Sequence, residues 1–159
     1  MRPIMEKKYC YRYVSTNDSR GRPVVQLFKR VIIRETEKTF WHVDDMPDWD
    51  LDQLIKYRTG GSKLRAKRNV KRCLKGGLRS SYHYTREEAL KAFAYRKIFQ
   101  IERMSLTLET VRLCLAGLRS AGYIDGSSYH CTVNRVPSGD FVAADEPGEV
   151  AKTYVWGEY

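Results

Sequence analysis

The longest regular pattern in the sequence lies between residues 85 and 122 and predicts a long helix. Thr85 followed by Glu88 forms a capping box, which starts a helix, and Gly122 is a residue type that ends one. Apolar side chains recur between them at alternating spacings of three and four residues, interrupted at Lys97; they are Leu90, Ala94, Ile101, Met104, Leu108, Val111, Cys114 or Leu115, and Leu118. We expect one long helix, or two helices bent near residues 105–107, whose apolar stripe packs on a sheet.

The residues before this helix predict an antiparallel sheet. Apolar and polar side chains alternate, as in half-buried strands, over residues 9–14, 24–36 and 39–44. Strand patterns return after Gly126 and end in a terminal strand over residues 151–159. The expected fold class is therefore α+β, with an N-terminal antiparallel meander packed on the long helix, or bent helix pair, and a C-terminal β-hairpin or strand extension.

A chain of 159 residues is long enough to bury a core within one domain. We expect an α+β core domain over residues 1–122, which contains a basic segment at 62–81, and a C-terminal β extension over residues 123–159 that packs on this core. No run approaches the roughly 18 apolar residues of a membrane span, and the first residues lack the apolar region of a signal peptide. The expected protein works inside a cell, without membrane contact.

Aspartates cluster between residues 44 and 52, and they allow two interpretations. Clustered carboxylates are ligands that hard cations prefer. Asp50 followed three residues later by Gln53 is instead typical of a helix start, where acids also complement the helix dipole. Two glycines at 60 and 61 would end such a helix. We favour the helix and predict no metal site.

Positive charge is concentrated in one part of the chain. The net charge is +10, and the window from Lys56 to Ser81 holds ten lysines and arginines and no acid, while the remaining residues carry 19 basic and 19 acidic side chains. Such a distribution produces a localised field rather than a generally basic surface. We expect a binding site for an anionic partner, with a solvated face as the alternative, at Lys63, Arg65, Lys67, Arg68, Lys71, Arg72, Lys75 and Arg79.

The secondary structure of this basic segment stays open. As a helix capped by Ser62, it would place four lysines in one stripe, at residues 63, 67, 71 and 75. As a strand, residues 69–74 alternate only weakly, and the segment is also a candidate for ordering on binding. In each case the arginines would make bidentate contacts with anionic groups, and the lysines would supply background charge.

Motifs of catalysis and nucleotide binding are absent. The sequence contains no G-x-x-x-x-G-K-[ST], G-x-G-x-x-G, H-E-x-x-H or G-x-S-x-G, and its four cysteines lack the spacing of a zinc site or a disulfide framework. We expect a non-catalytic protein without a cofactor. The enzymatic alternative is a small nuclease that uses Asp44, Asp45 and His42.

Residues 105–142 are a second candidate site. The last turns of the long helix and the hairpin predicted after it resemble the recognition helix and wing of winged helix-turn-helix proteins. Arg112 and Arg119 would then reach the bases of DNA. Against this interpretation, Gln100 and Ile101 occupy positions where the preceding helix usually has a small and an apolar residue.

Several motifs, taken in order, resemble a widespread group of small bacteriophage-encoded proteins. They are "RET" at 34–36 leading to an aromatic residue, the basic segment, the helix start "YTREEA" at 84–89, and "RKIFQI" at 96–101. The resemblance covers roughly residues 30–115 and departs at the acidic insert near 44–60 and at the tail beyond Gly122. The group has no established biochemical activity, so the resemblance implies a viral context and transfers no active site.

The charge distribution and this resemblance together favour a non-catalytic phage accessory protein in the host cytoplasm. We expect it to bind and modulate or inhibit a host protein or nucleoprotein, in host takeover or anti-defence, through the basic segment. Direct binding of DNA or RNA, by that segment or by the winged-helix-like region, is the alternative. The long helix is also a candidate contact for a homodimer.

Overall fold

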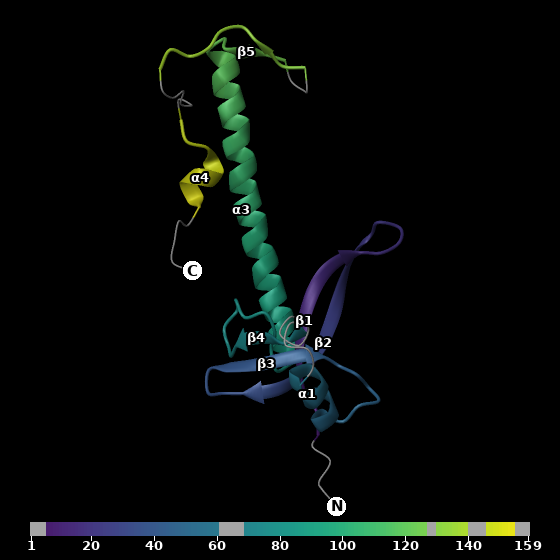
Figure 1. Cartoon of the computed structure of the whole chain (residues 1–159). Coiled ribbons are helices and arrows are strands. Elements are labelled where there is room, and N and C mark those ends of the chain that lie inside the picture. The colour runs from purple at the N-terminus through teal and green to yellow at the C-terminus, as the bar shows by residue number, and fades with distance from the viewer. Residues whose placement is uncertain (1–5, 61–68, 127–129, 140–145, 155–159) are drawn as a thin grey trace, which may run out of the picture. The chain divides into compact units, whose positions relative to one another are not determined.

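The fold is α+β, as the sequence predicts (Figure 1). The computed structural model describes residues 6–60, 69–126, 130–139 and 146–154. The chain divides into two compact units, Met1–Lys97 and Ile98–Tyr159. This division falls within the long helix, whereas the domain boundary after residue 122 stays a prediction.

The first unit is built on a four-stranded antiparallel sheet with the strand order β1-β2-β3-β4. Its strands are β1 (Lys8–Asn17), β2 (Pro23–Glu35), β3 (Thr39–Asp44) and β4 (Lys71–Leu74). The three predicted strands of the meander are confirmed. β4 shows that this part of the basic segment is a strand and not a helix. Four of the predicted contact residues, Lys63, Arg65, Lys67 and Arg68, lie outside the described residues.

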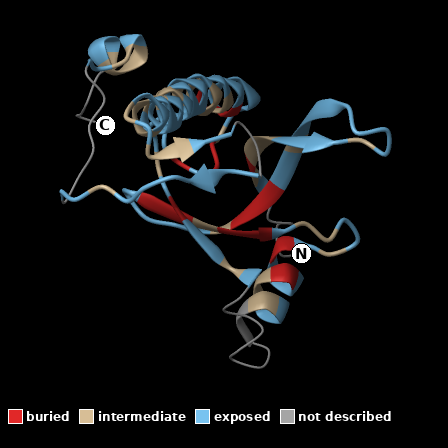
Figure 2. Cartoon of the chain, turned by 90° about the horizontal axis from the view of Figure 1, so that it is seen from above, coloured by how far each residue is buried: buried red, intermediate tan, exposed pale blue. Residues whose placement is uncertain are grey.

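Both faces of this sheet carry apolar clusters, and buried residues lie along β3 and in the second half of β2 (Figure 2). On one face Val31 and Val43 pack with two leucines of the helix α1 (Leu51–Gly60). The other cluster joins Ile32 and Phe40 to Cys10, Cys73 and Tyr82. Successive side chains of a strand point to opposite faces, which explains how neighbours such as Val31 and Ile32 serve different clusters.

The start of α1 has the predicted capping box. The backbone amide of Gln53 donates to Asp50 Oδ1 at 2.7 Å, and the amide of Asp50 donates to Gln53 Oε1 at 3.0 Å. Two amides at the helix start are therefore satisfied by side chains. Leu51 and Leu54, just behind the cap, are buried against the sheet.

The long helix α3 (Arg86–Ser120) is one continuous helix. Its predicted start is confirmed, because the amide of Glu88 donates to Thr85 Oγ1 at 3.1 Å. The bend near residues 105–107 is not found. The Thr107 hydroxyl donates to the carbonyl of Arg103 at 2.9 Å, so this polar side chain is satisfied within the helix without interrupting it.

The predicted burial of the apolar stripe on α3 is wrong over most of its length. Ile101 and Met104 are 64% and 62% exposed, and Leu108 is 50% exposed. The buried residues of α3 are Ala89 and Ala92, both in its first two turns. None of the helices among the described residues combines the length and the apolar character needed to span a membrane.

The second unit contains α3 from Ile98 onward, a short hairpin of β5 (Ile124–Asp125) and β6 (Thr132–Val133), and the helix α4 (Glu149–Thr153). The predicted hairpin is present. The predicted terminal strand over 151–159 is wrong for Ala151–Thr153, which is helical, and residues 155–159 lie outside the described residues.

A carboxylate of α3 holds the start of α4. Glu109 accepts hydrogen bonds from the amides of Val150 at 2.8 Å and Ala151 at 2.9 Å. Gly148 makes room for this carboxylate, because a Cβ at that position would clash with Glu109. These amides have no partner within the helix itself, so α4 depends on a side chain far away in the sequence.

We expect Asp50→Ala to lower the free energy of unfolding by about 1 kcal/mol, because the helix loses its N-cap. Asp52→Ala is the matched control, since it removes a carboxylate of the first turn that takes no part in the reciprocal capping pair. Its loss should be only a few tenths of a kcal/mol. Urea unfolding measures both variants, and equal losses would contradict the role of the cap.

Candidate functional site

The described part of the basic segment borders a surface hollow of about 630 Å³. We call it the basic hollow, and it lies where β4 and the loop after it meet the β2–β3 turn. Four cationic residues line it, namely Lys38, Arg72, Lys75 and Arg79. Among the described lining residues, Glu37 is the acid. The lining therefore carries an excess of positive charge, which favours an anionic ligand.

The loop that closes the hollow has a defined backbone. Gly76 and Gly77 have φ values of 67° and 84°, which glycine adopts without strain, and the chain turns there. The Ser80 hydroxyl donates to the carbonyl of Gly76, and the Ser80 amide donates to the carbonyl of Gly77 at 3.3 Å. The amide of Lys75 donates to the carbonyl of Lys38 at 2.9 Å, which ties the loop to the β2–β3 turn.

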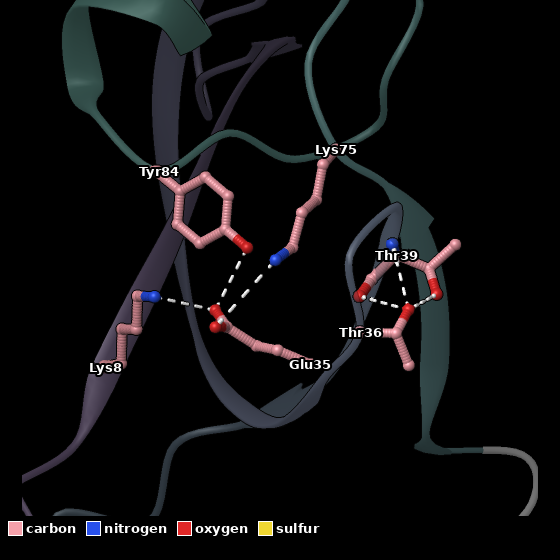
Figure 3. A network of polar contacts seen from close by, with 6 residues as sticks. All are labelled: Lys8, Glu35, Thr36, Thr39, Lys75 and Tyr84. Atoms are coloured by element: carbon pink, nitrogen blue, oxygen red, sulfur yellow. Dashed lines mark hydrogen bonds and ion pairs between the residues drawn. The ribbon is translucent and has the colours of Figure 1, made fainter.

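A network of polar contacts around the Glu35 carboxylate lies beside Lys75 (Figure 3). Glu35 Oε1 lies 2.8 Å from Lys8 Nζ and accepts a hydrogen bond from the Tyr84 hydroxyl at 3.0 Å, while Lys75 Nζ is 4.0 Å from Oε2. The hydrogen bond from Lys8 is the main reason why the pKa of Glu35 lies below its usual value, so the carboxylate stays ionised at neutral pH. Burial, together with Glu35, raises the pKa of Tyr84 and keeps its hydroxyl a donor.

The β2–β3 turn that carries Lys38 is closed by two threonines, also seen in Figure 3. The hydroxyls of Thr36 and Thr39 lie 2.7 Å apart, and the Thr36 amide donates to the carbonyl of Thr39 at 2.8 Å. Hydroxyl groups that bind each other and the backbone stabilise a tight connection between strands. Lys38 therefore projects from an ordered turn.

A second cationic feature, the arginine-tryptophan row, lies on the sheet next to the hollow. It consists of Arg34 of β2, Trp41 of β3 and Arg72 of β4, which are directly opposite one another in the two strand pairs. The guanidinium carbons lie 4.8 Å (Arg34) and 5.8 Å (Arg72) from the Trp41 ring centroid, within the range of a cation–π interaction. Because Arg72 also lines the hollow, the two features are continuous.

An irregularity in the sheet produces this row. The register of β2 and β3 shifts between Ile32 and Arg34. Without the shift, Ile33 would lie opposite Trp41, since Ile32 already pairs with His42. The shift brings Arg34 to the indole instead. In the part of the chain that the structure describes, no carboxylate forms an ion pair with either arginine of the row.

The described members of the predicted basic segment do not share one surface. Three of them, Arg72, Lys75 and Arg79, border the hollow. Lys71 of β4 lies opposite His42 of β3, so its side chain points to the other face of the sheet from that of Arg72. Sequence reasoning missed Lys38, Arg34 and Trp41. Alternation in β3 placed Trp41 on a face, but nothing in the sequence indicated which side chains of the neighbouring strands would flank it.

The second predicted site is not a winged helix-turn-helix. Such a motif needs a turn between two helices, and α3 is continuous from Arg86 to Ser120. Arg119 Nε donates to the carbonyl of Gly126 at 2.9 Å, which holds the chain directly after β5. Arg112 is exposed on α3. Contact of these arginines with DNA stays a prediction, but the winged helix-turn-helix fold that suggested it is not present.

Asp44 and Asp45, two residues of the nuclease alternative, make contacts that stabilise the first unit. Asp45 Oδ1 is 2.8 Å from Lys7 Nζ, and Asp45 Oδ2 accepts a hydrogen bond from the Tyr9 hydroxyl at 3.3 Å. Asp44 Oδ1 is 3.0 Å from Arg30 Nη1. Within the described ranges, no group of three or more histidine, cysteine, aspartate or glutamate side chains is placed to hold a metal ion.

His42, the third residue of that alternative, is 1% exposed and lies between aromatic rings. Its ring centroid is 4.3 Å from that of Tyr82 and 5.8 Å from that of Phe40. Burial above all, and then the positive charge of Arg30, lowers the pKa of His42 to about 4. Nδ1 has no hydrogen-bond partner in the described part of the chain. The side chain is therefore neutral at pH 7 and part of the core.

This histidine should make the protein less stable in mild acid. An unfolded histidine has a pKa near 6.5, so the unfolded chain binds the proton more tightly, and stability falls as the pH drops from about 6.5 towards 4. Between pH 7.5 and pH 4.5 the free energy of unfolding falls, and we expect this fall to be about 2 kcal/mol smaller for His42→Phe than for the natural sequence. Urea unfolding at both pH values measures it, and parallel losses would contradict the lowered pKa.

Comparison with known proteins finds no match: no family model, no curated protein and no solved structure matches the chain.

Proposed function

We propose that the protein is a non-catalytic binding protein that holds an anionic surface of a partner at the basic hollow. The observation that carries this proposal is the lining of the hollow, where Lys38 from the β2–β3 turn joins Arg72, Lys75 and Arg79 from β4 and its loop. Two of these cations have a neighbour that favours one position, since Lys75 Nζ lies 4.0 Å from Glu35 Oε2 and the Arg72 guanidinium lies 5.8 Å from the Trp41 ring centroid. Ordered cations lose less freedom on binding than mobile ones.

The proposed partner is a host protein or nucleoprotein, which the chain would modulate or inhibit as a phage accessory protein in the host cytoplasm. Two observations support this. The motifs that resemble phage proteins include the strand end at residues 34–36, next to the hollow, and the helix start at 84–89, whose tyrosine belongs to the Glu35 network. The charged residues of the nuclease alternative are engaged in structural contacts.

Direct binding of DNA or RNA is the second candidate function, and the arginine-tryptophan row favours it. Surfaces that bind nucleic acid combine cations with aromatic rings, and Trp41 with Arg34 and Arg72 provides both. The row is continuous with the hollow through Arg72, so one ligand could contact both.

Affinity capture from a bacterial lysate tests the proposed function. We expect the tagged protein to retain a partner. The double variant Lys38→Gln/Arg79→Gln should retain about tenfold less of this partner, because the hollow loses two positive charges. The control, Arg20→Gln/Lys91→Gln, removes the same charge from exposed positions outside the hollow and should behave as the natural sequence.

Each capture is divided into nuclease-treated and untreated halves. A partner protein retained in both halves, and lost in the hollow variant alone, agrees with a host protein. Loss after nuclease treatment identifies nucleic acid as the bound group. Equal capture by the hollow variant and its control would show that the hollow is not the contact.

A further inference from the structure

We propose that the arginine-tryptophan row and the basic hollow together form one binding site for the phosphodiester backbone of nucleic acid. This inference rests on the proposed function, because it names the chemical group that the same surface binds. It adds Arg34 and Trp41 to the site, two residues outside the basic segment. It also favours nucleic acid over an acidic protein as the ligand.

The first argument is the geometry of the two guanidinium groups. Arg34 and Arg72 flank the Trp41 ring, with their central carbons 4.8 and 5.8 Å from its centroid. A guanidinium that lies against an aromatic ring keeps its N–H groups free to bind two oxygens of one phosphate. Trp41 therefore orients both arginines before any ligand arrives, which reduces the ordering that binding requires.

The second argument is spacing. Adjacent strands lie about 4.8 Å apart, so the backbones that carry Arg34 and Arg72 are roughly 10 Å apart across β3. A ligand with a negative charge at every repeat can contact both arginines and continue to Arg79 and Lys38 in the hollow. Nucleic acid has such a repeat, with one phosphate in each nucleotide.

The third argument is the ring itself. Trp41 is only half-buried, although its neighbours Phe40 and His42 in β3 are fully buried. Both arginines beside it are exposed, and neither forms an ion pair within the described part of the chain. An acidic protein surface would use the cations and gain little from an indole. A nucleic acid gains from both, since a base can pack on the plane of a guanidinium group that itself lies against the ring.

The test measures binding of the full chain to three labelled probes by fluorescence anisotropy. The probes are a short single-stranded oligonucleotide, a duplex of the same length, and poly-glutamate of equal charge. We expect the chain to bind at least one nucleic-acid probe, and we expect this binding to weaken as the salt concentration rises. The slope of log K against log salt concentration should be about −0.7 per phosphate contact for the single strand and about −0.9 for the duplex. Comparison of the two nucleic-acid probes shows whether the site binds single-stranded or double-stranded nucleic acid.

Two variants isolate the row while leaving the formal charge unchanged. Trp41→Leu removes the ring, and Arg34→Lys removes the planar fork. We expect each to weaken nucleic-acid binding about fivefold and to change poly-glutamate binding by less than about twofold. Arg20→Gln, which removes an exposed arginine from the β1–β2 turn, is the control and should weaken nucleic-acid binding by less than about twofold. Circular dichroism and thermal unfolding check that both row variants fold. If Trp41→Leu does not fold, Arg34→Lys still tests the row.

The outcomes separate this inference from the proposed function. Binding of poly-glutamate alone, lost in Lys38→Gln/Arg79→Gln, would overturn the phosphodiester site and leave an anion-binding hollow. Nucleic-acid binding unchanged in both row variants would also overturn it, because the row would then take no part. If none of the three probes binds, the phosphodiester site is overturned, while the proposed function is decided by the capture experiment with Lys38→Gln/Arg79→Gln.

Discussion

The first unit depends on the burial of β3 from both sides of the sheet. Phe40 and Val43 are fully buried, and they belong to the two different apolar clusters. Strand pairing on both edges of β3, with β2 and with β4, satisfies its backbone while its side chains fill the core. Because β3 is paired on both edges and covered on both faces, few of its side chains are exposed to solvent. Trp41 is the large side chain of β3 that stays half-buried, and the candidate site forms around it.

The candidate site follows from the way in which two short connections meet at one end of β3. The β2–β3 turn is closed by Thr36 and Thr39, and the loop after β4 turns at two glycines. The hydrogen bond between the backbones of Lys75 and Lys38 joins these connections, so cations from distant parts of the sequence line one hollow. Glu35 contributes a carboxylate that binds Lys8 at 2.8 Å and lies 4.0 Å from Lys75 Nζ.

The long helix shows why periodicity is a good guide to secondary structure and a weaker guide to burial. The three-and-four spacing predicts α3 correctly, because any helix places such residues on one face. Whether that face is buried depends on the element that lies against it. In the first unit the buried residues of α3 are Ala89 and Ala92, and in the second unit Glu109 binds the start of α4. None of these residues belongs to the apolar stripe.

Local signals in the sequence were sufficient for the α+β class, the three strands of the meander and the starts of both longer helices, because capping and alternation act between near neighbours. The concentration of positive charge was also visible, although Lys71 and Arg72 separate onto opposite faces once residues 71–74 form a strand. The tertiary structure alone decided that Arg34 and Arg72 flank Trp41. That arrangement depends on the register shift after Ile32 and on the pairing of β4 with β3, which bring together residues from three strands. Pairing between distant segments is selected by the packing of the whole sheet, so no local pattern records it.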